Sequence, residues 1–433
     1  GARTGLGTRS GPVTLRSADL WNEDRMTTPP APRGAPWYFG SVAAFMIPSG
    51  IQTVLLPYLL AIELRQAPDR FGLTLMFGQL PVLLLLLVGG WAADRVDPRR
   101  LLMGLQAAGI LMPLVLASVL WLGQVSEPIV LLYAVVWGTV SAFAMPARDG
   151  LLNRVAGANV QRMVTMTMGI QFGTQMLGQA LAGQAGQWGA ISVLLAQCVV
   201  LAIGVYTAYR LPPGVQAGPG RASGSIGREL VSGLAVLFTT PQIRPVFLLI
   251  CAMGVFFAGV FVVLIPLAVR DLYAGGARDI AVAMIAFGMG TITSIVALIR
   301  MGGLKVPGRA LCLSQFAGCA TLVPIAMASP MWVFYLCIFG WGMCGGVAMT
   351  MSRTIMQEYA PPTHRSRVMA AFSLGTGGGA PIGSLLMGYA ISLLGVRWSV
   401  LVPVIGVTIT TLTVMSTHSL WSQRSHRGEA TPG

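Results

Sequence analysis

The amino-acid sequence predicts an all-α membrane protein with twelve transmembrane helices arranged in two six-helix bundles. The chain has 433 residues, of which 55% are hydrophobic and only 10% are charged, with a mean hydropathy of +0.72. A soluble domain needs about a quarter of its residues charged, so this composition excludes a water-soluble protein. Apolar residues gather in repeated blocks near the ~18 residues that cross a bilayer, and the second half of the chain repeats positions of the first.

Twelve apolar blocks are expected to be membrane helices, because lipid forces each segment to satisfy its backbone amides internally. Charged residues flank these blocks and do not interrupt them. The predicted spans are residues 37–62, 71–93, 101–122, 128–148, 164–186, 190–210, 245–269, 280–300, 310–328, 331–352, 368–392 and 398–417.

The basic residues give the expected orientation. With the N-terminus placed in the cytoplasm, 23 of the 28 Lys and Arg residues fall on that side. The positive-inside rule therefore predicts a multi-pass protein of the bacterial inner (plasma) membrane with both termini cytoplasmic. The net charge of +14 then reflects topology, and its partner is the anionic lipid of the bilayer, not nucleic acid. The basic residues on the opposite side are Arg65, Arg70, Arg270, Arg278 and Arg397.

The two halves of the chain are related by an internal duplication. A shift of 205 positions places the stretch after the fourth span on the stretch after the tenth. This shift is half of the membrane region and pairs span one with span seven in the same orientation, which predicts a parallel repeat. The identities in register are Arg148 with Arg353, Arg162 with Arg367, Gly173 with Gly378, Gly178 with Gly383, and Gly183 with Gly388.

Composition divides the chain into five segments. The polar, proline-rich tail is expected to be disordered, and Met26 within it is a candidate start of the native chain. The segments are a cytoplasmic tail at 1–36, a six-helix bundle at 37–211, a cytoplasmic Pro/Gly/Ser-rich linker at 212–244, a second bundle at 245–417 and a cytoplasmic tail at 418–433.

Three short motifs carry a family resemblance. Residues 89–100 read GGWAADRVDPRR, residues 144–152 read AMPARDGLL, and residues 365–369 read RSRVM ahead of the APIG at 380–383. The first resembles the signature loop of the major facilitator superfamily, in which a glycine precedes Asp-Arg and a basic cluster. The other two resemble the enterobactin-exporter-like and macrolide-efflux-like branch. The resemblance covers residues 37–417 and implies the two-bundle fold of that superfamily.

The motifs depart from the family pattern at identifiable positions. Asp97 and Pro98 stand where glycine and a basic residue are usual, and the matching loop at 302–309, GGLKVPGR, lacks the Asp. Gln179 stands where the glycine-rich motif of exporters has proline. This motif alone therefore does not give the direction of transport.

The resemblance implies a gate at the cytoplasmic ends of the helices. Asp94, at the end of span two, would accept amides from the start of span eleven near Arg367, because a helix N-terminus favours an anion. Arg99 or Arg100 would pair with Asp149 below span four; the alternative is that these charges only fix topology. The expected gate residues are Asp94, Arg95, Arg99, Arg100, Arg148, Asp149, Arg353 and Arg367.

Polar residues at membrane depth are candidates for a substrate cavity. Gln171, Gln175 and Gln179 recur every four residues and share one face of span five. Gly169 and Gly173 fall on the opposite face, where small residues permit close helix packing. The amides could equally well bond between helices. The expected cavity residues are Gln52, Tyr58, Gln79, Gln171, Gln175 and Gln179.

The ionisable residues limit the possible chemistry. None of the 14 Asp and Glu residues falls at a bilayer midplane, which leaves Glu63 at the outer end of span one as the candidate for proton coupling. The single lysine, Lys305, is not in a phosphate-binding loop. The six Cys lie in apolar spans without a Cys-x-x-Cys pair. The sequence predicts no catalytic residues, no metal and no cofactor.

The expected function follows from the resemblance. The chain would be a monomeric secondary active transporter, not an enzyme, that exports a small amphipathic substrate such as a drug or siderophore. It would work by alternating access and by proton antiport. The alternatives are an uptake carrier of the same fold, or a membrane sensor or scaffold that transports nothing.

Overall fold

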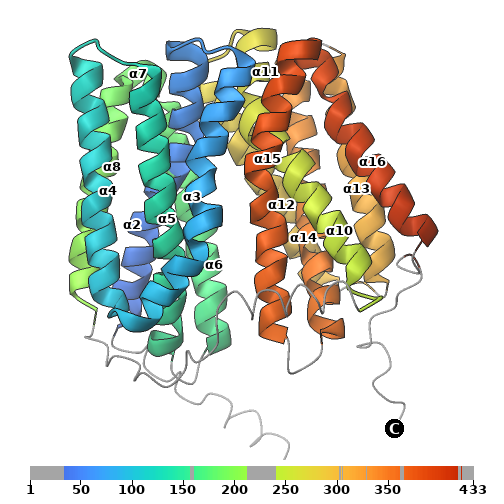
Figure 1. Cartoon of the computed structure of the whole chain (residues 1–433), viewed down its shortest axis with the longest axis horizontal. Helices are drawn as coiled ribbons and strands as arrows, with labels where there is room; N and C mark the ends of the chain where they lie inside the picture. The colour runs from blue at the N-terminus through green and yellow to red at the C-terminus, as the bar shows by residue number, and fades with distance from the viewer. Residues whose placement is uncertain are drawn as a thin grey trace, which may run out of the picture.

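The computed structural model describes residues 34–156, 160–211, 240–301, 304, 306–327, 329–360, 365–417 and 421. The ordered elements within these ranges are all helical (Figure 1). The first half contains α2 (Ala35–Tyr58), η1 (Leu59–Glu63), α3 (Pro68–Arg95), α4 (Pro98–Trp121), α5 (Glu127–Ala156), α6 (Val160–Gly183), α7 (Ala185–Trp188) and α8 (Ala190–Tyr209). The second half contains α10 (Arg244–Ala252), η2 (Met253–Phe257), η3 (Val260–Leu264), α11 (Ile265–Tyr273), α12 (Ala277–Arg300), α13 (Pro307–Ala326), α14 (Met331–Tyr359), α15 (Arg365–Ser399) and α16 (Leu401–Thr417).

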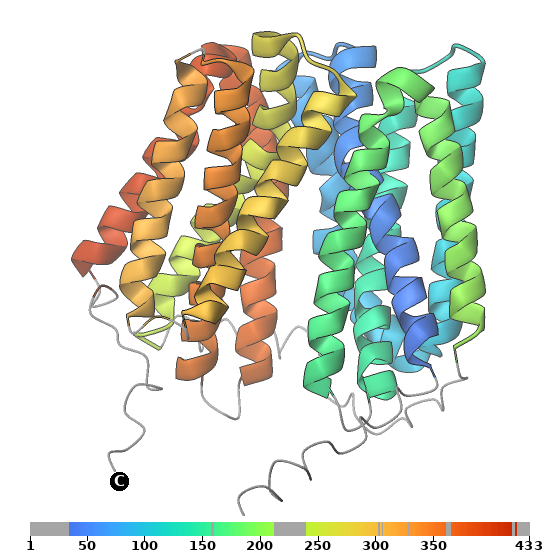
Figure 2. The same cartoon turned by 180° about the vertical axis from the view of Figure 1, so that it is seen from behind.

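Nine helical segments in the described ranges are long and apolar enough to cross a membrane, and α16 is a shorter apolar helix. Helices α3 and α6 run alongside the others in Figures 1 and 2 but are not among these nine. Four glutamines make α6 more polar than its neighbours. The all-helical membrane fold is confirmed, and the count of twelve spans stays a prediction.

The helices form two groups that stand side by side, α2 to α8 in one and α10 to α16 in the other (Figures 1 and 2). We call the end at which α8 stops and α10 begins the linker end, and the opposite end the far end. Most of the predicted tails and of the predicted linker, at 1–33, 212–239, 418–420 and 422–433, lies outside the described residues. The division into domains stays a prediction.

Two helices extend well past the predicted spans at the linker end. Helix α5 continues to Ala156 and α14 continues to Tyr359. The predicted span 128–148 ends too early, because Arg148 and Asp149 both lie inside α5. The rule that charges only flank the spans also fails at Arg148, which is 3% exposed.

Glycines set the closest helix contacts within each group. A Cβ on Gly178 of α6 would lie 2.0 Å from the carbonyl oxygen of Ile47 on α2. A Cβ on Gly383 of α15 would lie 2.0 Å from the carbonyl oxygen of Val255 in η2. Gly178 and Gly383 are one of the pairs related by the 205-residue shift. The duplication therefore preserves a packing contact between corresponding helices, as small residues at membrane interfaces allow.

Exposed aromatic rings mark the two ends of the bundle. Trp121, Trp188, Trp332 and Trp398 are all more than half exposed and lie at far-end helix termini. Tyr206 and Tyr209 are exposed at the linker end of α8. Tryptophan and tyrosine gather at the two membrane–water interfaces, so these residues agree with helices that cross the bilayer along their length.

Candidate transport pathway and gate residues

The two groups touch at the far end through two glycine contacts. A Cβ on Gly72 of α3 would lie 2.5 Å from the carbonyl oxygen of Ser384 and 2.8 Å from Cα of Gly388, both on α15. A Cβ on Gly183 of α6 would lie 2.8 Å from Cβ of Ala281 on α12. Gly183 and Gly388 are related by the 205-residue shift. Equivalent positions of the two halves thus close two equivalent seams between the groups, α3–α15 and α6–α12.

An arginine bridges the groups beside these seams. Nη1 of Arg270, at the end of α11, donates to the backbone carbonyl oxygens of Gln66 at 2.9 Å and Ala61 at 3.3 Å. The same guanidinium forms a bidentate ion pair with its neighbour Asp271. Ala61 lies in the π-helical segment η1, and Gln66 follows it. Arg270 therefore satisfies carbonyl groups at the end of the first spanning segment from the other half of the molecule.

A hydrogen bond joins the groups deeper along the α3–α15 seam. Nε2 of Gln79 donates to Oγ of Ser384 at 2.9 Å and to the carbonyl oxygen of Leu75 at 3.2 Å. A Cβ on Gly378 would lie 3.1 Å from a methyl group of Leu83. Gln79, which was predicted to line a cavity, forms a hydrogen bond between the two halves in this conformation.

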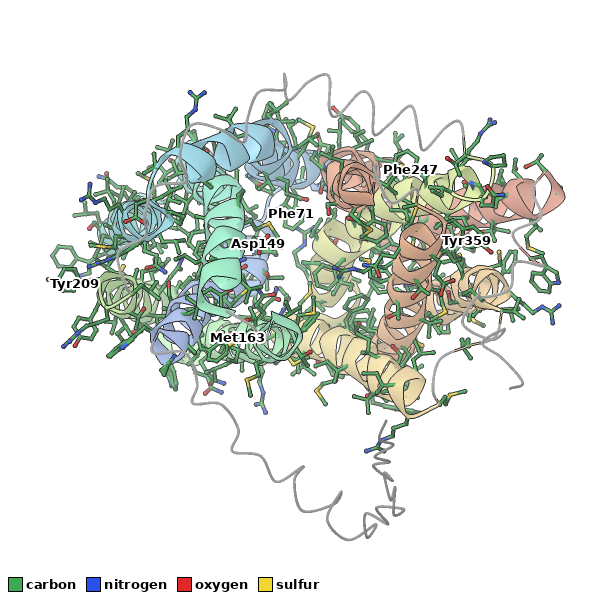
Figure 3. The ribbon with its side chains drawn as sticks, turned by 90° about the horizontal axis from the view of Figure 1, so that it is seen from below. Phe71, Asp149, Met163, Tyr209, Phe247 and Tyr359 are labelled. Atoms are coloured by element: carbon green, nitrogen blue, oxygen red, sulfur yellow. The ribbon has the colours of Figure 1, made fainter. Side chains whose placement is uncertain are left out.

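These inter-group contacts all lie in the far and middle parts of the helices. From there the ribbons of the two groups diverge toward the linker end (Figures 1 and 2). Viewed from that end, Asp149 and Met163 of the first group lie across from Phe247 and Tyr359 of the second (Figure 3). The observed conformation is therefore held together at its far end.

The remaining predicted cavity residues have unequal environments. Gln52 on α2 is 8% exposed, and neither its Nε2 nor its Oε1 has a hydrogen-bond partner within the described ranges. Gln171 and Gln175 on α6 are half-buried, and Gln179 is buried. Burying an amide without hydrogen-bond partners at membrane depth costs free energy unless a ligand or water bonds it. Gln52 is therefore the strongest candidate for a substrate contact in this set. The carbonyl of Gln175 faces Gly50 of α2.

The glycine face predicted for α6 was assigned the wrong role. Gly169 and Gly173 are exposed, and a Cβ at either position would meet nothing within 4 Å. The close packing of α6 is made by Gly178 against α2 and by Gly183 against α12. Both follow Gly173 at spacings that rotate them onto packed faces of the helix.

Tyr58 and Glu63 form a pair at the far end. The hydroxyl of Tyr58 donates to Oε1 of Glu63 at 2.6 Å across one turn of η1. Tyr58 is buried and Glu63 is exposed. The predicted coupling carboxylate therefore has a direct hydrogen-bond partner and lies on the same π-helical segment that Arg270 contacts.

At the linker end, Arg148 is part of the core of the first group. Its guanidinium carbon lies 5.0 Å from the ring centre of Phe45, which stacks on Trp137. Nε and Nη1 of Arg148 have no hydrogen-bond partner among the described residues. Asp149, next in the chain, is exposed. Arg148 is thus a buried cation on an aromatic ring, an environment that the sequence did not indicate.

The other predicted gate residues are only partly described. Nη2 of Arg99 donates to the carbonyl oxygen of Tyr209, and no ion pair joins Arg99 to Asp149 among the described residues, so the pairing of Arg99 with Asp149 stays a prediction. No ion pair joins Arg100 to Asp149 in the part of the chain that the structure describes. Arg95, Arg100 and Arg353 are exposed, whereas the side chains of Asp94 and Arg367 lie outside the described residues.

Sequence reasoning missed two features of the structure. Arg270 had been counted only as an outer basic residue, because no sequence signal shows that a π-helical segment of the other half offers it carbonyl oxygens. The second feature is an aromatic cluster between η2, η3, α12 and α14. Its ring centres are 5.6 Å apart for Phe257 and Trp341, 4.8 Å for Phe287 and Trp341, and 5.0 Å for Phe261 and Phe287.

A groove of about 470 Å³ opens at the far end between α3, α11 and α15. Its lining includes Pro68, Asp271, Arg397 and Trp398. None of the six predicted cavity residues contributes to it. This groove is therefore separate from the polar residues at membrane depth.

Known structures share this architecture at low sequence identity. The nucleoside transporter NupG superimposes with a TM-score of 0.71 at 12% identity, covering 90% of this chain and 100% of that one. A D-xylose-proton symporter gives 0.69 at 11%, covering 90% and 99%. The peptide transporter POT in complex with sulfate gives 0.66 at 13%, covering 89% and 94%. These similarities show the fold alone.

No curated protein matches the chain significantly in sequence. The profile of the Major Facilitator Superfamily matches residues 38–373 and, in a second match, residues 279–432. These matches together span nearly the whole described structure. With its two helical groups joined by equivalent glycine seams, the chain belongs to the Major Facilitator Superfamily.

Proposed function

We propose that the protein is a secondary active transporter that works by alternating access between its two helical groups. The observation that carries this proposal is the far-end closure, in which the Gly72–Gly388 and Gly183–Ala281 contacts and the Arg270 bridge lie at one end. Contacts confined to one end can break while the packing inside each group is kept. That is the property a rocking carrier needs.

The orientation of the carrier is part of the proposal. The 23 basic residues on one side favour a cytoplasmic linker end, so the observed conformation would be open to the cytoplasm. Reporter fusions after Arg210 and after Arg270 should then report opposite compartments. The same compartment for both would overturn the topology and, with it, the assignment of the far end to the outside.

Export of a small amphipathic molecule, such as a drug or siderophore, is the direction and substrate class that we propose. The resemblance of residues 144–152 and 365–369 to the enterobactin-exporter-like and macrolide-efflux-like branch supports it. The amide of Gln52, which has no partner among the described residues, and the half-buried Gln171 and Gln175 supply polar contacts in an otherwise apolar bundle. We further propose coupling by proton antiport, with Glu63 as the candidate carboxylate.

The alternating-access proposal is tested by two label pairs. Arg65 and Ser392 are exposed near the far ends of the two groups, and Met145 and Met349 are exposed on α5 and α14 toward the linker end. Spin labels at each pair should report distances that change in opposite directions when a pH gradient or candidate substrates are applied. A sensor or scaffold would keep one distance population at both ends.

Direction and coupling are tested in proteoliposomes of known orientation. An imposed pH gradient should drive amphipathic fluorescent drugs or iron-free siderophores out of the cytoplasmic side, with matching proton movement reported by a pH-sensitive dye. Glu63→Gln should abolish proton movement while retaining downhill substrate exchange. Movement of substrate and proton in the same direction would favour the alternative, an uptake carrier.

A further inference from the structure

The exposed residues of α8 form one continuous face. Leu195, Val199 and Ile203 are 46%, 60% and 52% exposed and are followed on the same face by Tyr206 and Arg210. The spacings of four, four, three and four residues keep all five within one stripe of the helix. The stripe changes from aliphatic to aromatic to cationic as it approaches the linker end.

The linker end of this stripe is a preorganised cluster of arginines and aromatic rings. Nε and Nη2 of Arg210 donate to the hydroxyl of Tyr206 at 3.0 and 2.7 Å. The guanidinium carbon of Arg210 lies 5.5 Å from the ring centre of Trp37, and Trp37 meets Tyr206 edge to face at 6.0 Å. Contacts from two helices, α2 and α8, thus hold Arg210 in place while it remains exposed.

A second guanidinium reaches the same end of α8 from α4. Arg99 donates to the carbonyl oxygen of Tyr209, and its guanidinium carbon lies 5.1 Å from the centre of that ring. The carboxylate nearest in sequence, Asp97, accepts a hydrogen bond from the backbone amide of Arg99 at 3.2 Å as the N-cap of α4. Within the described residues, Arg99 and Arg210 form no ion pair with any carboxylate.

Position and length indicate the kind of partner. Tyr209 lies at the outer edge of the first group, away from the second group (Figure 3). Eleven residues separate Leu195 from Tyr206, and a helix rises about 16 Å over that distance. Half of a hydrocarbon core of about 30 Å has nearly the same depth. The stripe therefore matches one lipid leaflet, with the arginines at headgroup level.

We propose that the α2–α4–α8 corner is a binding site for an anionic phospholipid, with its phosphate between Arg210 and Arg99 and one acyl chain along Leu195, Val199 and Ile203. Tyr206 holds the guanidinium of Arg210, and Trp37 covers its face. Arginine is suited to this role because its planar fork bonds phosphate oxygens in two places while it stacks on aromatic rings. The site does not depend on the proposed transport activity.

The test measures lipid binding to the full-length protein in phosphatidylcholine nanodiscs. Phosphatidylglycerol is titrated in, and the bound lipid is counted by native mass spectrometry. Arg210→Gln should weaken the tightest phosphatidylglycerol binding about fivefold, the effect of one interfacial arginine. Arg309→Gln is the matched control, because Arg309 lies 5.0 Å from a single ring, Trp421, outside this corner. It should leave that binding unchanged.

Arg210→Lys distinguishes a specific phosphate site from general electrostatic attraction of anionic lipid. It also gives a second variant of the same position in case Arg210→Gln does not fold. Lysine keeps the charge but loses the fork and the stacking geometry, so binding should weaken nearly as much as in Arg210→Gln. Equal loss in the Arg210 and Arg309 variants, or wild-type binding by Arg210→Lys, would overturn the proposal in favour of general electrostatics. Displacement of the lipid by millimolar inorganic phosphate would overturn it in favour of a free-anion site.

Discussion

Nη1 of Arg270 donates a 2.9 Å hydrogen bond to the backbone carbonyl oxygen of Gln66, and this bond joins the two halves of the molecule. The acceptor is backbone, so no substitution at position 66 other than one that moves the chain can remove it. The donor is a single side chain that is 19% exposed. Among the far-end contacts, this hydrogen bond therefore depends on one side chain alone, that of Arg270.

Arg270→Gln should open the far end. Hydrogen bonds from a charged donor contribute about 1.5–3 kcal/mol each when one partner is removed, and a shift of ~1.4 kcal/mol changes a two-state ratio tenfold. Labels at Arg65 and Ser392 should show a longer distance in the variant. Arg278→Gln is the control, because Arg278 is exposed at the same end. An unchanged far-end distance in Arg270→Gln would refute the role of the bridge.

Glycines between the groups and glycines within a group should differ in their effects. Gly388→Val introduces side-chain atoms where a Cβ would already lie 2.6 Å from the carbonyl oxygen of Pro68, so the far ends must separate while each group keeps its packing. Gly178→Val clashes inside one group and should lower the unfolding temperature. Gly169→Val meets open space and should do neither. Thermal unfolding and the far-end distance together distinguish the three outcomes.

Cysteine substitutions on α6 test which face of this helix is accessible to water. Gln171→Cys and Gln175→Cys should react with a water-soluble thiol reagent in a background without the native cysteines. Gly169→Cys and Gly173→Cys, on the exposed face with nothing nearby, should stay unlabelled in a bilayer because lipid covers them. The reverse pattern would place the cavity on the glycine face.

Arg148→Met should leave the unfolding temperature unchanged or raise it. A buried guanidinium whose Nε and Nη1 lack partners in the described part of the chain pays desolvation without full compensation, and hydrophobic replacement of buried charges is often neutral or stabilising by ~1–4 kcal/mol. Phe45 would pack against the methionine. A large drop in the unfolding temperature would show that Arg148 supports the fold through contacts beyond this ring.

Asp94→Asn tests the gate implied by the superfamily resemblance. The substitution keeps the size of the side chain but removes the charge that the N-terminus of α15 would favour by roughly 0.3–1 kcal/mol when exposed and more when partly buried. The linker end should then close less often, and transport should fall while insertion is unchanged. A disulfide crosslink between the linker ends of α3 and α15 should form more slowly. Crosslinking at the wild-type rate would mean that Asp94 only fixes the membrane topology.

Hydropathy and charge were sufficient to predict the fold class, because lipid leaves a segment few choices other than a helix. The duplication was also readable, and the pairs Gly178–Gly383 and Gly183–Gly388 make equivalent contacts in the structure. Helix ends were less predictable. The charge of Arg148 ends the apolar stretch in the sequence, so the predicted span stops there. Helix α5 nevertheless continues, because the guanidinium of Arg148 is covered by Phe45 of another helix.

Side-chain roles at the candidate site depended on which helices meet, which one sequence does not state. Gln79 looked like a cavity residue, but Ser384, more than three hundred residues later, accepts a hydrogen bond from its amide. Arg99 bonds the carbonyl oxygen of Tyr209 because the end of α8 lies within reach of its guanidinium. Each outcome required the arrangement of distant segments, whereas residue type and spacing report only local structure.

The two seams between the groups are alike in their glycines and unlike in their polar contacts. The α3–α15 seam carries the Gln79–Ser384 hydrogen bond at membrane depth, and at the α6–α12 seam the apolar Met176 meets Gly288. Breaking an amide–hydroxyl bond away from water is harder than separating a methionine from a glycine. In the proposed alternating-access cycle, the far ends should therefore separate by a rotation about an axis near α3 and α15, and the space between the groups should widen first beside α6.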